Sequence, residues 1–287
     1  MMRLVLAALA LACAPVVHAA DSPARWYVQV DNDVVYGTDR WYSSGVRIAR
    51  VTGTDTLSEW GVLQEVYTPE AKRWRPGIDD RAPTARLLLY GARHWLVGSC
   101  LETIEVGVGV RGPSALGRES TDVVHRLVPA PEVDWSREEG DRIDAQAVFA
   151  RSVPRGDFHV HFGAVAGNQQ AFAHGGVEWR VGSGARGALS PALRFAATPP
   201  PAAGTSGWAA FAGASVRAVA RNATIERNYD AFGPDLDPRR VVGRAAAGVA
   251  WVASWGSATF ALAHDTREFA AQRRAHGFGS LTVHLEF

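Results

Sequence analysis

Apolar and polar residues alternate along most of the chain after residue 24, and turn-forming residues separate the alternating segments. The segments "RIDAQAVFARS" and "SLTVHLEF" are clear examples. Strict alternation predicts half-buried β-strands, and almost no segment shows the spacing of an amphipathic helix. We therefore predict an all-β fold, with strands at residues 25–32, 42–53, 58–67, 84–96, 101–112, 143–153, 157–167, 173–183, 207–221, 241–254, 257–269 and 278–287.

The length of these strands separates two all-β architectures. Many of them reach or exceed the roughly 9–11 residues that a tilted transmembrane strand needs. Aromatic residues lie near their ends, as in outer-membrane barrels, which have an apolar lipid face and a polar lumen. A soluble β-sandwich or a lipocalin-like barrel would have a similar composition. Strand length, a signal for export and the terminal Phe287 favour a transmembrane antiparallel up-and-down β-barrel.

The lengths of the connections indicate an even number of strands. Bacterial outer-membrane barrels combine even strand numbers with short inner turns and long outer loops. If the chain starts on the inner side, its first, third and fifth connections lie outside, at 33–41, 68–83 and 113–142. The second, fourth and sixth are the short "GTDTL", "LVGSC" and "VPRG". A strand at 190–197 would make thirteen, so we assign 184–206 to an inner connection and predict twelve strands.

The N-terminal segment 1–20 has the pattern of a signal peptide. It combines the basic "MMR", the apolar "LVLAALALACAPVV" and a small-residue cleavage site near Ala19 or Ala20. Residues 21–287 then form one exported barrel, in which Cys100 is the single cysteine and has no disulfide partner. The formal net charge of +1 disfavours a nucleic-acid-binding protein.

Polar residues concentrate on three predicted outer loops. "VDNDVVYGTDRWYSSG" supplies the oxygen ligands that Ca²⁺ prefers, although a solvated turn rich in Asp and Asn has the same composition. The loop 113–142 carries His125 near carboxylates, as a general base requires, although many loop histidines are simply solvated. The third loop carries a basic set that suits phosphates or anionic lipid head groups, or is an ordinary charged loop: Lys72, Arg73, Arg75 and Arg81.

Taken together and in this order, these segments resemble the outer-membrane lipid A 3′-O-deacylase (LpxR-like) family. The matching stretches are "DNDVVYGTDRWYSSGVRI", "VYTPE" with "DRAPTA", "GVRGPSALG" with "VVHRL", "NATIERN" and "TREFAAQRRAHGFGSLTVHLEF". The resemblance covers nearly all of the chain after the signal peptide. No G-x-S-x-G nucleophile elbow and no H-E-x-x-H zinc motif is present.

The resemblance implies a twelve-stranded barrel in the outer membrane of a Gram-negative cell, and we expect the protein to be a monomer. It implies Ca²⁺-dependent hydrolysis of the ester-linked 3′-acyloxyacyl group of lipid A in the outer leaflet. Asn32 and Asp33 match the family's metal-site pair, Ser43 matches its active-site Thr or Ser, and His125 matches its catalytic histidine. Glu132 matches the accompanying Glu with a spacing that differs by about one residue.

The mechanism that follows is a water attack. His125, oriented by Glu132, would deprotonate the water while Ca²⁺ stabilises the oxyanion. From their charge alone, we expect the basic residues to dock the glucosamine phosphates: Lys72, Arg73, Arg75 and Arg81. Asp31 and Asp39 would only shape their loop. Thr121 stands where the family commonly has Gln, which could change the activity. The alternatives are a porin or lipopolysaccharide-binding barrel without enzymatic activity, and an outer-membrane phospholipase.

Overall fold

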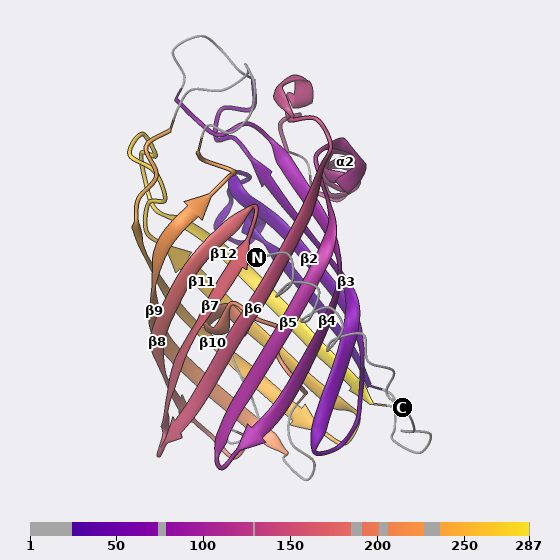
Figure 1. Ribbon diagram of the computed structural model, residues 1–287, viewed down its shortest axis with the longest axis vertical. Coiled ribbons are helices and arrows are strands. Elements are labelled where there is room, and N and C mark those ends of the chain that lie inside the picture. Colours follow the sequence, from indigo (N-terminus) through magenta and orange to yellow (C-terminus); the bar gives the residue numbers. More distant parts are fainter. Residues whose placement is uncertain are drawn as a thin grey trace, which may run out of the picture.

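The protein forms a closed antiparallel β-barrel in which each strand pairs with the next and β1 pairs with β12 (Figure 1). The computed structural model describes residues 25–73, 79–128, 130–184, 191–200, 206–226 and 236–286. The strands are β1 (Arg25–Asn32), β2 (Trp41–Thr52), β3 (Thr56–Thr68), β4 (Thr84–Val97), β5 (Cys100–Arg111), β6 (Arg142–Arg155), β7 (Phe158–Gly167), β8 (Gln170–Val181), β9 (Gly207–Asn222), β10 (Val241–Ala253), β11 (Gly256–Asp265) and β12 (His276–Glu286). The predicted twelve-stranded up-and-down barrel is confirmed. The signal segment 1–20, Arg75 and Phe287 lie outside the described residues.

Alternation along each strand gives the wall two different faces, because successive side chains of a strand point to opposite sides. Lumen-facing positions hold buried charged and polar side chains, including Arg47, Glu105 and His161. Outward positions hold exposed apolar residues such as Leu89 and Leu281. An apolar exterior around a polar lumen is what a lipid bilayer requires of a barrel.

Exposed tryptophans gather at one end of the barrel wall. They are Trp26, Trp60, Trp179, Trp208, Trp251 and Trp255. All lie at or near strand ends on the side of the barrel that carries the short turns. Tryptophan side chains favour the boundary between head groups and acyl chains. This set of tryptophans therefore marks where the short-turn end of the barrel meets the membrane surface. Among the described residues, no helix is long and apolar enough to cross a membrane.

The connections differ in length between the two ends, as the sequence predicted. The inner turns at 53–55, 98–99, 156–157 and 254–255 have two or three residues each. The opposite end carries most of the long loops and the helix α2 (Gly117–Leu127) (Figure 1). One outer connection, 168–169, is also a tight turn, and β8 begins three residues before the predicted strand.

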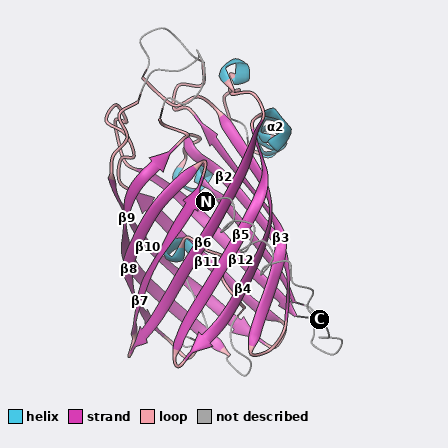
Figure 2. Cartoon of the chain, viewed as in Figure 1, coloured by secondary structure: helices cyan, strands magenta, loops and turns pink. Residues whose placement is uncertain are grey.

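Part of the inner connection between β8 and β9 lies inside the barrel, and the described residues 191–197 of the possible thirteenth strand do not form a spanning strand. Its described part contains the short helix α3 (Pro191–Arg194), and Figure 2 shows this helix within the outline of the barrel. Arg194 is fully buried and donates to Thr103 Oγ1 (2.9 Å), Ser152 Oγ (3.0 Å) and the carbonyl of Ala197 (3.1 Å).

Three further hydrogen bonds anchor the same segment to other parts of the wall. Glu105 on β5 accepts from the Ala197 amide at 3.0 Å. Arg244 on β10 donates to the Ala192 carbonyl at 3.0 Å, and His284 on β12 contacts the Thr198 carbonyl at 3.1 Å. Because these strands lie around the ring, residues 191–200 cross the lumen. We call them the lumen plug.

Candidate functional site

The loop between β1 and β2 is held by its own polar side chains. It contains the 3₁₀-helix η1 (Asp33–Tyr36), and the Asn32 side chain caps it by accepting from the Val34 amide at 2.8 Å. Asp33 is almost completely buried, and its Oδ2 accepts from Thr38 Oγ1 and from the Arg40 amide, both at 2.8 Å. These contacts explain part of the polar crowding in this loop.

A distortion at the start of β2 turns two neighbouring side chains to opposite sides of the wall. Trp41 has φ 58°, a left-handed conformation that is costly for a bulky residue, and a bulge follows between Tyr42 and Ser44. The Tyr42 hydroxyl points into the lumen and donates to Asp31 at 2.7 Å. The Ser43 hydroxyl instead bonds Thr68 Oγ1. Ser43 therefore belongs to the outer surface of the wall.

The helix α2 packs on that same outer surface. Gln64 of β3 points outward and donates to the Ala115 carbonyl in the turn before the helix, at 2.7 Å. An apolar cluster of Val66, Ala85, Ala115, Val133 and Trp135 joins the loop to β3 and β4. A side chain on Gly117 would overlap Ala85, so only glycine allows this close approach. The packing brings His125 against the first loop, where it contacts Asp39.

Asp39 lies at the point where three chain segments meet. Its Oδ2 is 3.2 Å from His125 Nε2 and 2.8 Å from Lys72 Nζ. Lys72 also donates to Thr68 Oγ1 at 3.0 Å, and Thr68 bonds Ser43. The side chains of Asp39 and His125 are each less than a fifth exposed. The sequence-based expectation gave Asp39 only a loop-shaping role, but the structure places its carboxylate against the histidine.

These groups line one cleft between the barrel wall and α2, with a volume of about 450 Å³. Its polar part includes Asn32, Asp33, Asp39, Ser43, Lys72, Thr121 and His125. Its apolar part includes Val34, Val124, Val128, Ala130 and Pro131. The structure thus brings together the predicted residues Asn32, Asp33, Ser43 and His125. A cleft with a charged and an apolar part suits an amphiphilic molecule.

Burial changes the proton affinity of two groups in this cleft. It raises the pKa of Asp33 to about 7, although the hydrogen bonds from the Arg40 amide and Thr38 oppose the shift. Burial also lowers the pKa of Lys72, while the Asp39 carboxylate acts in the opposite direction. The carboxylate of Asp33 is therefore short of positive partners, because the ammonium of Lys72 pairs with Asp39 instead.

Other predicted site residues lie elsewhere. Glu132 is exposed and does not line the cleft, and no ion pair between described residues joins it to His125. Arg73 is exposed. Arg81 is only 2% exposed and pairs with Glu268 at 2.6 Å, so it is not accessible to a lipid head group. Arg81 was predicted to bind substrate, but in the structure it forms an ion pair that joins two loops of the barrel mouth.

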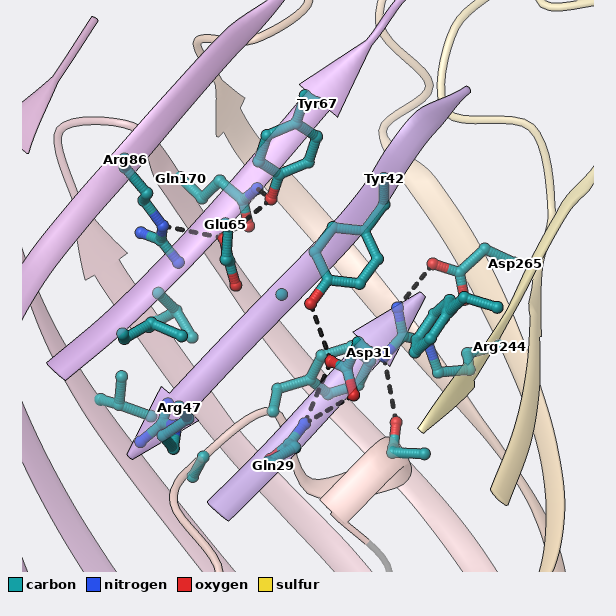
Figure 3. A pocket seen from close by; sticks show the side chains of 18 of the residues that line it. Gln29, Asp31, Tyr42, Arg47, Glu65, Tyr67, Arg86, Gln170, Arg244 and Asp265 are labelled. Carbon is teal, nitrogen blue, oxygen red and sulfur yellow. Dashed lines mark hydrogen bonds and ion pairs between the residues drawn. The ribbon is translucent and has the colours of Figure 1, made fainter. Parts of the chain in front are cut away.

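A second cavity, of about 130 Å³, lies inside the lumen on the other face of β2 and β3 (Figure 3). Most of the basic and acidic side chains that line it pair with one another, whereas Asp31 accepts from Tyr42 and Gln29. Arg86 bonds Glu65 at 2.8 Å, and Arg244 bonds Asp265 at 2.5 Å. Desolvated charges of this kind are committed to one another, so the paired carboxylates offer no available base. We therefore take the outer cleft as the candidate site.

Comparison with known proteins identifies the family. The model of a family described as outer membrane protein LpxR matches residues 4–287. The chain belongs to the LpxR family. Comparison with curated proteins gave no match.

The fold agrees with this assignment. LpxR from Salmonella typhimurium is 20% identical, with a TM-score of 0.74, over 92% of this chain and 100% of that chain. Pseudomonas putida OprB is 8% identical, with a TM-score of 0.35, over 93% of this chain and 94% of that one. The beta domain of the Bordetella autotransporter BrkA is 11% identical, with a TM-score of 0.42, over 93% and 98%. Barrel and LpxR membership together support a location in the outer membrane.

The resemblance implies Ca²⁺ as the cofactor, so the side chains of this LpxR-family cleft should include oxygen ligands for that ion. Among the described residues, no group of three or more His, Cys, Asp or Glu side chains is placed to hold a metal ion. The buried carboxylate of Asp33 and the amide oxygen of Asn32 are nevertheless hard oxygen donors that line the cleft. They fit a calcium site with one protein carboxylate. Affinity depends on the number of charged ligands, so such a site would bind weakly, roughly in the 10⁻⁴–10⁻³ M range of extracellular modules.

Proposed function

We propose that this LpxR-family protein hydrolyses the ester-linked 3′-acyloxyacyl group of lipid A in the outer leaflet, with Ca²⁺ as cofactor. The observation that carries the proposal is the contact between His125 and Asp39 in a cleft on the lipid-facing side of the wall. A histidine paired with a carboxylate is the arrangement of a general base. The resemblance described above gives the substrate and the bond.

The chain's own residues account for the activation of water. His125 Nε2 lies 3.2 Å from Asp39 Oδ2, so in this proposal Nε2 carries the proton and Nδ1 accepts a proton from water. Asp39 then stabilises the imidazolium that forms. Lys72 pairs with the same carboxylate and holds it in place. A positioned base of this kind contributes about 10²–10⁴-fold to a rate.

Asn32 and Asp33 are the residues that would hold the cation. When bound, Ca²⁺ supplies a positive charge that polarises the ester carbonyl and stabilises the oxyanion. Ser43, oriented by Thr68, adds a hydroxyl donor on the same side of the cleft. The apolar residues Val124 and Val128 would receive the acyl chain directly from the leaflet. One chain supplies all these groups, so a monomer is sufficient.

Mass spectrometry of lipid A tests the proposal. Gram-negative cells that express the protein should lose the mass of the 3′-acyloxyacyl group, and cells with His125→Ala should not. His159→Ala is the matched control, because this histidine lies at the other end of the barrel on β7. Purified protein should lose activity in chelator and regain it with Ca²⁺. Unchanged lipid A with wild-type protein, together with cleavage of phospholipid, would instead support the phospholipase alternative.

A further inference from the structure

We propose that Arg40 and Arg274, which share the carboxylate of Glu70 at the rim of the cleft, form a binding site for a phosphate group on the sugar head group of the substrate. The inference rests on the proposed function and deepens it. It replaces the basic loop of the sequence prediction, where Arg81 is buried against Glu268.

Two guanidinium groups converge on one acidic oxygen. Glu70 Oε1 is 2.6 Å from Arg40 Nη1 and 3.2 Å from Arg274 Nη2. Two positive charges against one negative charge leave this cluster with a net charge of +1, and the side chain of Arg274 is largely exposed. The planar fork of arginine matches the oxygens of phosphate and can bond two of them at once.

Arg40 is fixed before any ligand arrives. Its guanidinium lies over the ring of Trp41, 4.5 Å from the ring centre, and its side chain is only 12% exposed. Its Nε is buried and has no hydrogen-bond partner among the described residues. A buried donor without a partner costs free energy, which a ligand oxygen at this position would recover.

Arg274 is exposed, but its backbone is held. The side chain of Gln272, which is fully buried, accepts from the Glu268 amide at 2.7 Å and donates to the Arg274 carbonyl at 2.9 Å. Phe269 of the same loop packs edge-on against Trp41. The exposed guanidinium, 66% accessible, therefore projects from a fixed position beside the cleft. Because the backbone is already held, only the side chain loses freedom when it binds an anion.

The location fits a phosphorylated glycolipid. Arg40 and Glu70 line the same cleft as His125, in its polar part, whereas Val128 and Ala130 line the apolar part. A substrate whose acyl ester reaches His125 would place its sugar toward the polar rim. A phosphate on that sugar then meets Arg40 and Arg274 while the acyl chain stays among apolar residues.

Steady-state kinetics with two substrates tests the site. The substrates are lipid A and the same lipid A after enzymatic removal of its head-group phosphates, both at saturating Ca²⁺. Arg274→Gln should raise KM for the phosphorylated substrate about tenfold, the equivalent of one charge-assisted hydrogen bond, with kcat within about twofold. KM for the dephosphorylated substrate should not change. Arg274→Lys, which keeps the charge but loses the fork, should give a smaller increase.

Arg267→Gln is the control, because this arginine is an exposed residue of the same loop outside the cluster. Equal KM values of the wild-type protein for both substrates would overturn the phosphate site and leave the proposed hydrolysis intact. An equal rise in KM for both substrates in Arg274→Gln would also overturn it, since the residue would then act by packing. Hydrolysis of neither substrate by the wild-type protein would refute the proposed function itself.

Discussion

Replacing Asp39 by Asn removes the charge next to His125 while keeping the size of the side chain. Unit charges about 4 Å apart interact by about 4 kcal/mol where the effective dielectric constant is near 20. The Asp39–His125 distance is 3.2 Å, but Lys72 shares the same oxygen and offsets part of the attraction. We therefore take half of that value, about 2 kcal/mol, as the loss of imidazolium stabilisation. It corresponds to roughly a thirtyfold fall in kcat.

The assay is single-turnover hydrolysis of lipid A by purified protein in detergent, followed by mass spectrometry, with folding checked by heat-dependent mobility on gels. Asp237→Asn, at an exposed position on another outer loop, is the control. Glu132→Gln provides the decisive comparison, because Glu132 was the orienting carboxylate expected from the sequence. A large loss with Glu132→Gln and none with Asp39→Asn would refute the assignment of the orienting role to Asp39.

Three further changes test the surroundings of the site and the stability of the barrel. Ser43→Ala should lower kcat about tenfold by removing a hydrogen-bond donor, whereas Ser43→Thr, which keeps the hydroxyl, should remain active in the same assay. Gly45→Ala should lower the free energy of unfolding by about 1–3 kcal/mol in urea titrations in bilayers, because the new methyl group would overlap the Tyr42 hydroxyl. Burial raises the pKa of Glu138 to about 7. The folded state thus holds this proton more tightly than the unfolded chain does. The free energy of unfolding should therefore fall as the pH rises from about 4.5 to 7. Urea titrations at pH 5 and pH 8 should show a smaller fall in Glu138→Gln than in the wild-type protein.

The strands could be predicted because the cause of the pattern is local. In a strand between lipid and a polar lumen, apolar and polar side chains must alternate from one residue to the next. The sequence and the burial pattern of β6 both show this alternation. The helix α2 could not be predicted in this way. Its sequence "GRESTDVVHRL" is polar and contains β-branched residues, and the helix is stabilised by packing on the outer wall of the barrel.

The candidate site was only partly predictable, for reasons that lie in long-range geometry. Nothing in the sequence near Asp39 distinguishes it from Asp31. Asp31 lies in β1 and bonds Tyr42 in the lumen, whereas the role of Asp39 depends on its contact with His125, which lies far away in the sequence. Arg81 resembles a surface residue until it meets Glu268, 187 positions later in the chain. Resemblance to the family found His125 and Asn32, but the partners of these residues required the fold.

The lumen plug has a consequence for the cell that makes this protein. An unobstructed ring of twelve strands could let water and small ions leak across the outer membrane, and every copy would weaken the permeability barrier. Here the hydrogen bonds of Arg194 to Thr103, Ser152 and Ala197 hold the obstruction in place. We expect planar bilayers containing the protein to show no steady conductance. Cells could then express it at high levels without becoming more sensitive to small hydrophilic antibiotics.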